Sequence, residues 1–515
     1  MFVRKKKNRS GSVSIAVVDK SKGCYREIRQ FGVAHTEAEV RSLVRQANDW
    51  ISGYAGQGLI DFEGVAVSRK SDIDRFVDRI DSASINGTYM LLSQVYDLVG
   101  FNRIEDEILR HLVIARICQP ASKLATTAYL RSYYKEDVHL SRICRYMDKL
   151  YNRQMERVQE ISIAHTRQIM GGSIGLLFYD VTTLYFETAP EDDMRQAGFS
   201  KDGKTSEAQV VLGLLVSKDG YPLSYSIFNG SQYEGYTMIP VIDDFVHRFS
   251  LKDFVVVADS GLMSERNVKL LRSAGYKYIV GARIKSEDSA TKDWILSLEK
   301  EDGVEYECLR PDGDRLIVSY SSSRAANNAK NRDKGVERLQ KSYRSGILTK
   351  ANINRRGYNK FLEISGDVQV RINPEKIAGD KRWDGLKGYV TDTDLAAGEV
   401  INQYHGLWVV ERAFRISKGN LEMRPIFHFT ERRIEAHVCI CFAAYKVYKE
   451  LERIIKLSGI GLSVDKVIDI AKTIISIDIK TDGVNGTARR TLFLTEEQKI
   501  IQPLFNLAKL VSHFG

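Results

Sequence analysis

Between residues 173 and 284 the chain runs through apolar stretches whose order limits the folds available to it. GLLFYDVTTLYF is typical of a buried strand, and the next two strand-like stretches are joined by Lys218-Asp219-Gly220, a hairpin signal. A helix, a strand, a helix and a strand follow, which gives the order β-β-β-α-β-α-β. Asp180 lies on the first of these strands, and Asp259 lies at the end of the fourth.

This order is similar to that of the ribonuclease H-like fold, an α/β fold in which three antiparallel strands come first. The fourth strand of that fold lies beside the first. We therefore expect Asp180 and Asp259 to become neighbours, although they are far apart in the sequence.

A third carboxylate stands in the segment YHGLWVVERAFRISK, from Tyr404 to Lys418. Read as one helix, the segment places on one stripe an acid flanked by cations and aromatics: Tyr404, Trp408, Glu411, Arg415 and Lys418. Asp180, Asp259 and Glu411, on strand, strand and helix, form the arrangement that a two-metal phosphoryl-transfer site needs. The alternative is an amphipathic helix with solvated charges and two unrelated aspartates.

Residues 285–384 separate the second carboxylate from the third and contain the strand-like stretches VEYECLR, RLIVSY and FLEISGDVQVRI. This pattern predicts a β-rich insertion that returns to the same sheet edge. The formal net charge of the chain is +10, and residues 321–360 hold eleven Lys or Arg against only two acids. Such a segment favours a polyanionic partner, with Arg355, Arg356 and Lys360 as candidate DNA contacts, over a merely solvated helix and loop.

The rest of the chain divides by pattern. Alternating strands and a charged helix predict a small β/α segment at the N-terminus. Helical periodicity dominates from residue 89 to residue 170, which predicts either a DNA-binding domain or helical packing without a role in DNA binding. We expect a ribonuclease H-like catalytic core interrupted by the insertion and followed by a helical tail. The expected segments are 1–60 (β/α), 85–172 (helical), 173–284 (core, first part), 285–384 (insertion), 385–458 (core, second part) and 459–515 (helical tail).

Composition narrows the function classes. The six cysteines include no CxxC pair, and no histidine cluster accompanies them, which argues against a zinc site. No stretch approaches the length of a membrane span, and the basic start lacks a signal-peptide core. We expect a protein of the cytoplasm, associated with the nucleoid.

The sequence segments around Asp180, Asp259 and Glu411 together resemble those of the DDE transposases of bacterial and archaeal insertion sequences. In the most similar group, the third carboxylate belongs to a Tyr-x2-Arg-x3-Glu-x6-Lys signature and a β-rich insertion interrupts the core. Tyr404, Glu411 and Lys418 match that spacing, whereas Leu407 occupies the arginine position. Arg412 and Arg415 supply nearby cations. The resemblance covers roughly residues 90 to 450.

The resemblance implies a DNA transposase that cleaves the ends of its element and transfers the 3′ ends to target DNA. It implies two Mg²⁺ or Mn²⁺ ions held by the three carboxylates, and a homodimer assembled on terminal inverted repeats and target DNA. Tyr404, Arg412, Arg415 and Lys418 are then expected to contact DNA. Trp408 could stack on a base or pack in the core, and packing in the core is the favoured expectation. The alternatives are a ribonuclease H-like nuclease without strand transfer and a non-catalytic DNA-binding descendant of a transposase.

Overall fold

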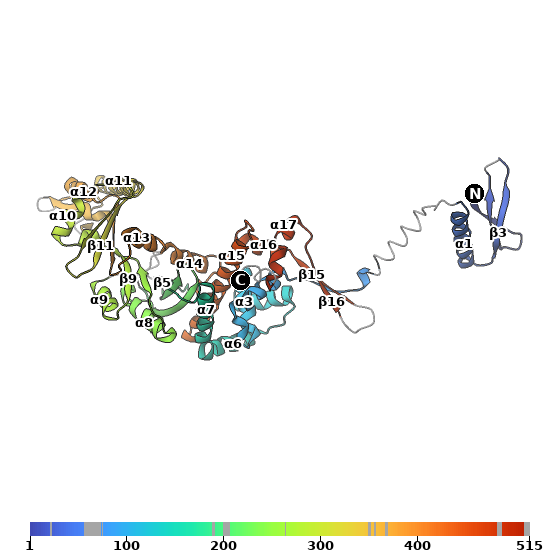
Figure 1. Ribbon diagram of the computed structural model, residues 1–515, viewed down its shortest axis with the longest axis horizontal. Helices are drawn as coiled ribbons and strands as arrows, with labels where there is room; N and C mark the ends of the chain where they lie inside the picture. Colours follow the sequence, from blue (N-terminus) through green and yellow to red (C-terminus); the bar gives the residue numbers. More distant parts are fainter. Residues whose placement is uncertain are drawn as a thin grey trace. The chain divides into compact units, whose positions relative to one another are not determined.

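The computed structural model forms two compact units, each considered by itself (Figure 1). The first unit comprises residues 1–82 and 478–489, and the second comprises residues 83–477 and 490–515. The structure describes residues 1–20, 23–55, 74, 76–187, 191–198, 207–262, 264–348, 352–354, 357–365, 369–480 and 487–508. No helix among them is long and apolar enough to cross a membrane.

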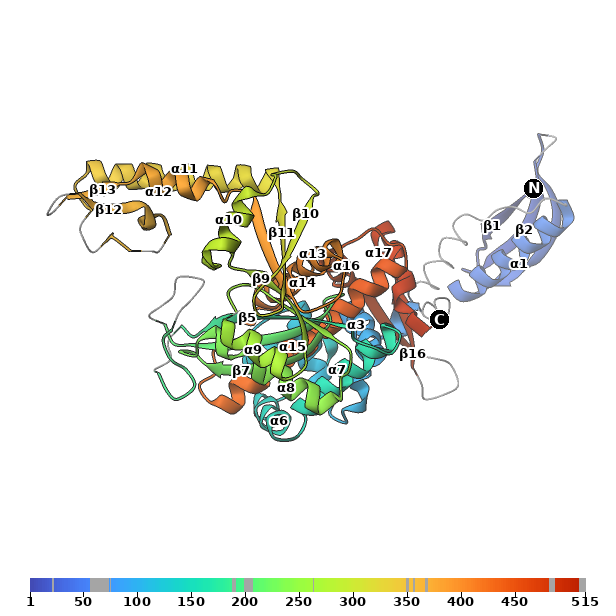
Figure 2. The same ribbon diagram turned by 60° about the vertical axis from the view of Figure 1, so that its left-hand side comes forward.

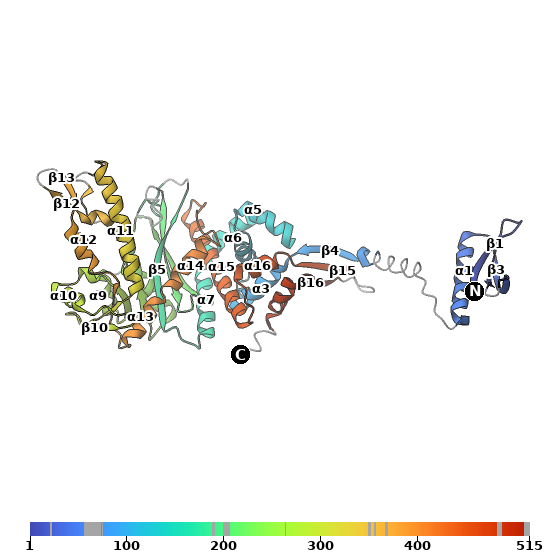
Figure 3. The ribbon, with the colours of Figure 1, turned by 90° about the horizontal axis from the view of Figure 1, so that it is seen from above.

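The first unit begins with an antiparallel sheet of β1 (Phe2–Lys7), β2 (Val13–Asp19) and β3 (Arg26–Ala34), with β2 in the middle. Helix α1 (Glu37–Ala55) packs against one face of this sheet (Figure 3). The apolar alternation of β2 explains the packing, because Ile15 and Val17 on its buried side contact the cluster that includes Ala47 and Ile51 of α1.

An eight-stranded mixed sheet forms the centre of the second unit, in the order β10-β11-β14-β9-β8-β5-β6-β7. Its first five strands in the sequence are β5 (Leu176–Tyr185), β6 (Gln209–Ser217), β7 (Pro222–Asn229), β8 (Val255–Ala258) and β9 (Lys277–Ala282). Strands β5, β6 and β7 are antiparallel, whereas β8 runs parallel to β5 and β9 runs parallel to β8. The expected placement of the fourth strand beside the first is confirmed, and the sheet is consistent with a ribonuclease H-like core.

The insertion differs from the β-rich segment that we expected. Strands β10 (Glu305–Leu309) and β11 (Arg315–Tyr320) extend the central sheet next to β14 (Leu386–Thr391). Between β11 and β14 lie the long helix α11 (Ser322–Arg344), the hairpin of β12 (Leu362–Ser365) and β13 (Gln369–Ile372), and α12 (Pro374–Lys381), which Figure 2 shows beyond the sheet. The polar sequence of α11 lacks an apolar stripe, which is why periodicity did not reveal a helix.

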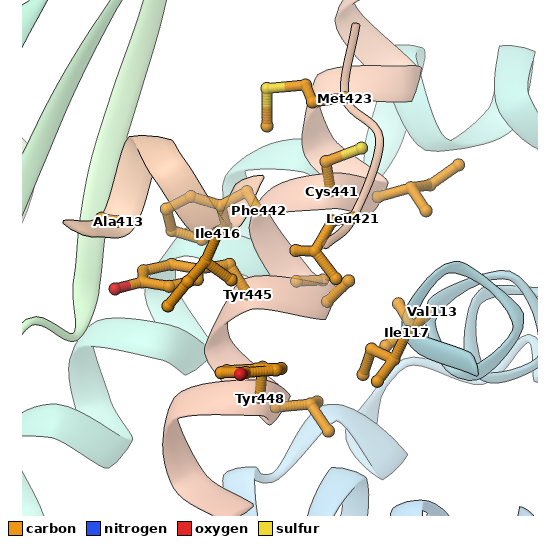
Figure 4. Close-up of a cluster of buried hydrophobic side chains, with 14 of the residues drawn as sticks. Val113, Ile117, Ala413, Ile416, Leu421, Met423, Cys441, Phe442, Tyr445 and Tyr448 are labelled. Atoms are coloured by element: carbon orange, nitrogen blue, oxygen red, sulfur yellow. The ribbon is translucent and has the colours of Figure 1, made fainter. Parts of the chain in front are cut away.

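Helices cover both faces of the sheet. One face packs with α8 (Met238–Phe249), α9 (Glu265–Ser273) and α10 (Ser289–Ser297), and the other packs with α13 (Ala397–His405), α14 (Trp408–Lys418) and α15 (Glu431–Leu457). Around α15 lie α3 (Gly87–Val99), α4 (Glu107–Cys118), α6 (Leu140–Arg153) and α7 (Met155–Ile169), with α5 (Lys123–Tyr129) against α4 and α6. Figure 4 shows Phe442 and Tyr445 of α15 with Ile416 of α14 and Ile117 of α4. These helices therefore share one hydrophobic core with the sheet, and a DNA-binding role for 85–172 stays a prediction.

The C-terminal segment is not purely helical, in contrast to the expectation. Helix α16 (Val464–Ala471) is followed by strands β15 (Ile475–Lys480) and β16 (Thr487–Leu492) and then by α17 (Glu496–Ile501). The two strands belong to a three-stranded sheet whose third strand is β4 (Ile80–Ile85). This pairing partner lies almost four hundred residues upstream in the sequence, so no local pattern could indicate it.

Candidate active site

Asp180 and Asp259 lie at corresponding positions of two neighbouring parallel strands. The register pairs Tyr179 of β5 with Ala258 of β8, and each aspartate is the next residue along its chain. Phe178 and Val257, two positions before them, belong to the hydrophobic cluster that includes α13, α14 and α15. Because alternate strand residues point to the same face, both carboxylates lie on the side of the sheet that these helices cover.

Hydrogen bonds hold the Asp259 carboxylate. The Tyr404 hydroxyl donates to Asp259 Oδ1 over 2.8 Å. Burial opposes ionisation of Asp259, but donation from Tyr404 and from the backbone N–H groups of Ser260 and Gly261 outweighs it, and the pKa is lowered. Arg283 Nε in turn donates to the Ser260 carbonyl over 3.2 Å. The turn that carries Asp259 is therefore fixed from two sides.

The segment expected to form one helix is divided into two. Helix α13 ends at His405 and α14 begins at Trp408. A Cβ added to Gly406 would lie 2.4 Å from Phe178 Cζ, so a glycine is required where the chain approaches β5. The division turns Tyr404 into the core, where it is 4% exposed. Its hydroxyl binds Asp259 in this structure, and the expected contact of Tyr404 with a DNA phosphate stays a prediction.

Helix α14 keeps the expected stripe over its own length. Glu411 and Arg415 are exposed one turn apart, while Val410 and Phe414 on the opposite side are buried. Trp408, at the start of the helix, is 56% exposed, so the expectation that it packs in the core is wrong. Glu411 and Arg415 thus share one accessible surface on the helix that packs against β5.

Three other predicted DNA contacts have a different environment from the one expected. Arg412 forms an ion pair with Glu452 of α15, which turns its guanidinium toward the protein. Lys360 Nζ lies 2.8 Å from Asp380 Oδ1, and it shares this carboxylate with Lys285 at 2.7 Å. Lys418 is half-buried at the end of α14. Arg355 and Arg356 lie outside the described residues.

Lys387 is a member of this site that sequence reasoning missed. Its Nζ lies 4.3 Å from the centre of the Tyr404 ring. Burial and then the charge of Arg324 lower the pKa of Lys387, while the charges of Asp259 and Glu411 act in the opposite direction. A cation therefore lies within the electrostatic reach of two of the three carboxylates. The only signal was a lysine inside the otherwise apolar strand β14.

The three carboxylates are ligands of a chemical type that binds divalent metal ions. Asp180, Asp259 and Glu411 offer only oxygen ligands, which Mg²⁺ and Mn²⁺ prefer. Within the described part of the chain, however, no three acidic, histidine or cysteine side chains are close enough to hold an ion together. The donors are therefore of the right type, but the structure does not assemble them into one group.

Removing the Lys387 charge is expected to strengthen metal binding. The Lys387 ammonium would repel a divalent ion held by Asp259 and Glu411. Lys387→Met removes this repulsion, and we expect Mn²⁺ to bind about tenfold more tightly. Calorimetric titration with Mn²⁺ measures the change directly. Lys387→Arg keeps the charge and should titrate like the parent. Weaker binding by Lys387→Met would contradict this role.

Comparison with known proteins gives an independent finding. The model of the transposase DDE domain matches residues 171–446, more than half of the chain. Among solved structures, the chain is similar to a piggyBac transposase synaptic complex with hairpin DNA, at 11% identity over 84% of this chain and 81% of that chain, with a TM-score of 0.38. A Mos1 transposase paired-end complex with the left transposon end shows 11% identity over 31% of this chain and 58% of that chain, with a TM-score of 0.16. No curated protein sequence matches. The matched residues contain Asp180, Asp259 and Glu411, and the chain belongs to the transposase DDE domain family.

Proposed function

We propose that this protein is a transposase that cleaves DNA at the ends of an insertion sequence and transfers the 3′ ends to target DNA. The main support is the register of β5 and β8, which places Asp180 beside Asp259 on the face covered by the Glu411 helix. Family membership supports the same reaction class. Because one chain offers one such site and an element has two ends, we propose a homodimer assembled on the terminal inverted repeats.

In this proposal Asp180, Asp259 and Glu411 would hold two Mg²⁺ or Mn²⁺ ions, and the ions would supply stabilisation of negative charge on phosphate oxygens. Tyr404 keeps the Asp259 carboxylate in one orientation through its hydroxyl. Arg415, exposed one turn from Glu411, can clamp a phosphate with two parallel hydrogen bonds. Lys418 is about 10 Å farther along the helix than Glu411, which suits a neighbouring phosphate.

The insertion contributes positive charge in this proposal. Its helix α11 has exposed cations along its length, which suit contacts with the DNA backbone: Lys330, Lys334, Arg338, Lys341 and Arg344. Arg332, in contrast, is buried and binds Asp384 over 2.6 Å. We propose that Arg355 and Arg356 add to the same backbone contacts.

The test uses the DNA that immediately flanks the gene. Duplexes of these flanks are incubated with the full chain and Mg²⁺, together with a supercoiled plasmid as target. We expect nicking at a fixed position and covalent joining of the 3′ ends to the plasmid. Cleavage without joining would identify a nuclease that lacks strand transfer. Binding without any cleavage would identify a DNA-binding protein without catalytic activity.

Arg415→Ala and Arg412→Ala form a matched pair on α14. Arg415→Ala is expected to reduce end cleavage roughly ten- to a hundredfold, the cost of losing charge-assisted hydrogen bonds to a phosphate. Arg412→Ala removes the pair with Glu452 and should lower the thermal midpoint, while the folded variant keeps near-parent cleavage. End cleavage by both variants is measured at two salt concentrations. Parent-like cleavage by Arg415→Ala would assign the phosphate contact to another residue.

A further inference from the structure

The first unit has a sheet with one covered face and one open face. Ile15 and Val17 of β2 pack against α1, and Val3 of β1 joins the same cluster. Phe2 of β1 and Val33 of β3, on the two outer strands, are each 44% exposed. Helix α1 therefore covers one face only.

The strand register identifies the side chains on the open face. Arg4 of β1 pairs with Ala16 of β2, and Lys6 pairs with Ser14. Directly opposed residues of antiparallel strands point to the same face, and successive residues alternate between faces. Because Val3 lies on the α1 side, Arg4 and Lys6 lie on the open side. Both are exposed, and among the described residues neither forms an ion pair.

An aromatic group lies beside these cations. Tyr25 is 60% exposed, with Arg4 5.5 Å and Lys20 5.1 Å from its ring centre. Phe2 packs against it in an edge-to-face arrangement at 6.3 Å. The Tyr25 ring is therefore already engaged by neighbours of its own unit, and it positions two cations rather than offering a free platform for an unpaired base.

The charge of the unit is concentrated on its strands. Residues 1–34 hold nine Lys or Arg and only two acids, Asp19 and Glu27. Helix α1 instead holds three acids and two arginines. A partner attracted to the sheet must therefore be anionic, and α1 is poorly suited to approach the same partner.

We propose that the open face of β1-β2-β3 binds duplex DNA, with Arg4, Lys6 and Lys20 contacting phosphates. A two- or three-stranded β-sheet can follow a DNA groove, because the major groove admits a β-ribbon. A duplex is favoured over a single strand, since the Tyr25 ring already has the cations of Arg4 and Lys20 over it, whereas single-strand sites offer rings on which bases stack. The proposal rests on the proposed function for the identity of the substrate, but it does not depend on cleavage.

The alternation of β1 supplies a matched control. The double variant Arg4→Gln/Lys6→Gln removes two charges from the open face. Lys5→Gln/Lys7→Gln removes two charges from the same strand on the other face, where Lys5 and Lys7 are also exposed. All four side chains lie on an edge strand outside the core, and thermal melting checks that both variants fold.

Binding of the full chain to a duplex from the flanking DNA is measured by fluorescence anisotropy over a series of salt concentrations. We expect Arg4→Gln/Lys6→Gln to bind roughly tenfold more weakly, with the log–log salt slope reduced by about 0.9 for each phosphate that the variant no longer neutralises. Lys5→Gln/Lys7→Gln should bind almost like the parent. A parent chain that binds but does not cleave contradicts the proposed function while leaving this inference intact.

Three results would overturn the inference. Equal losses of affinity in both double variants would show a general effect of charge. An unchanged affinity and slope in Arg4→Gln/Lys6→Gln would show that the open face does not touch DNA. A loss of affinity that appears with a single-stranded probe of the same sequence, but not with the duplex, would make this face a single-strand binder.

Discussion

Glu411→Ala is expected to abolish Mg²⁺-dependent cleavage while leaving end binding nearly unchanged. The substitution removes one of the three proposed carboxylate ligands but none of the proposed phosphate contacts. Loss of several kcal/mol of transition-state stabilisation corresponds to roughly a thousandfold or more in rate. Asp180→Ala and Asp259→Ala should behave in the same way. Cleavage of a labelled end duplex and anisotropy with the same duplex measure the two effects separately.

Glu431→Ala is the matched control. Glu431, like Glu411, is an exposed glutamate in the first turn of a helix, α15 instead of α14. It should cleave like the parent. Substantial cleavage by Glu411→Ala would show that another residue supplies the third carboxylate, and would remove the main reason to read α14 as a catalytic helix.

Glu450→Ala is expected to cause the largest loss of stability. Glu450 is fully buried in α15, where it accepts a hydrogen bond from Tyr221 over 2.9 Å and pairs with Arg453 over 2.6 Å. His165 lies 3.7 Å away. Removing one partner of a buried ionic group costs about 3–5 kcal/mol, because the remaining partners lose their counter-charge. Urea unfolding of the second unit, followed through its core aromatics, measures this loss.

The Glu450 carboxylate also makes the stability of the fold depend on pH. Burial opposes ionisation of Glu450, but its bonds to His165 and Arg453 lower the pKa from 4.5 to about 2. A lowered pKa stabilises the fold above the unfolded-state value, so this contribution is complete above about pH 4.5 and is lost as the pH falls toward 2. It amounts to about 3 kcal/mol. Glu450→Gln should flatten the dependence in this window.

An exposed pair provides the comparison for Glu450. Glu496 of α17 lies 2.7 Å from Lys499, and its side chain is 86% exposed. Surface pairs of this kind contribute at most about 1 kcal/mol. Glu496→Ala should therefore shift the unfolding midpoint only slightly. Similar losses of stability for the two variants would show that the Glu450 network does not stabilise the core.

The strand positions of Asp180 and Asp259 could be predicted because buried strands have a distinctive apolar pattern. GLLFYDVTTLYF and FVVVADSG leave little choice but buried strands, and the order of elements then fixes which strands are neighbours. The position of Glu411 on a helix was predictable as well, because the residues around it recur with helical spacing.

Tyr404 and Trp408 show where periodicity is insufficient. A two-residue interruption at Gly406 and Leu407 leaves the 3.6-residue pattern almost intact, although it separates two helices. Lys387 could not be assigned to the site because its neighbours Tyr404 and Asp259 reach it only through the tertiary fold. The ion pair between Arg412 and Glu452 is equally non-local.

The attachment of the insertion has a consequence for how such chains can vary. Residues 322–384 leave the sheet and return to it at one point, where Tyr320 pairs with Leu386 and the Ser321 N–H donates to the Gly385 carbonyl over 3.0 Å. Whatever lies between these ends, β14 enters the sheet in the same register and delivers α14 to the same place. Deletions, duplications or foreign domains between β11 and β14 can therefore be tolerated without displacing Glu411. This part of the chain is free to diversify in length while the sheet that carries Asp180 keeps its strand register.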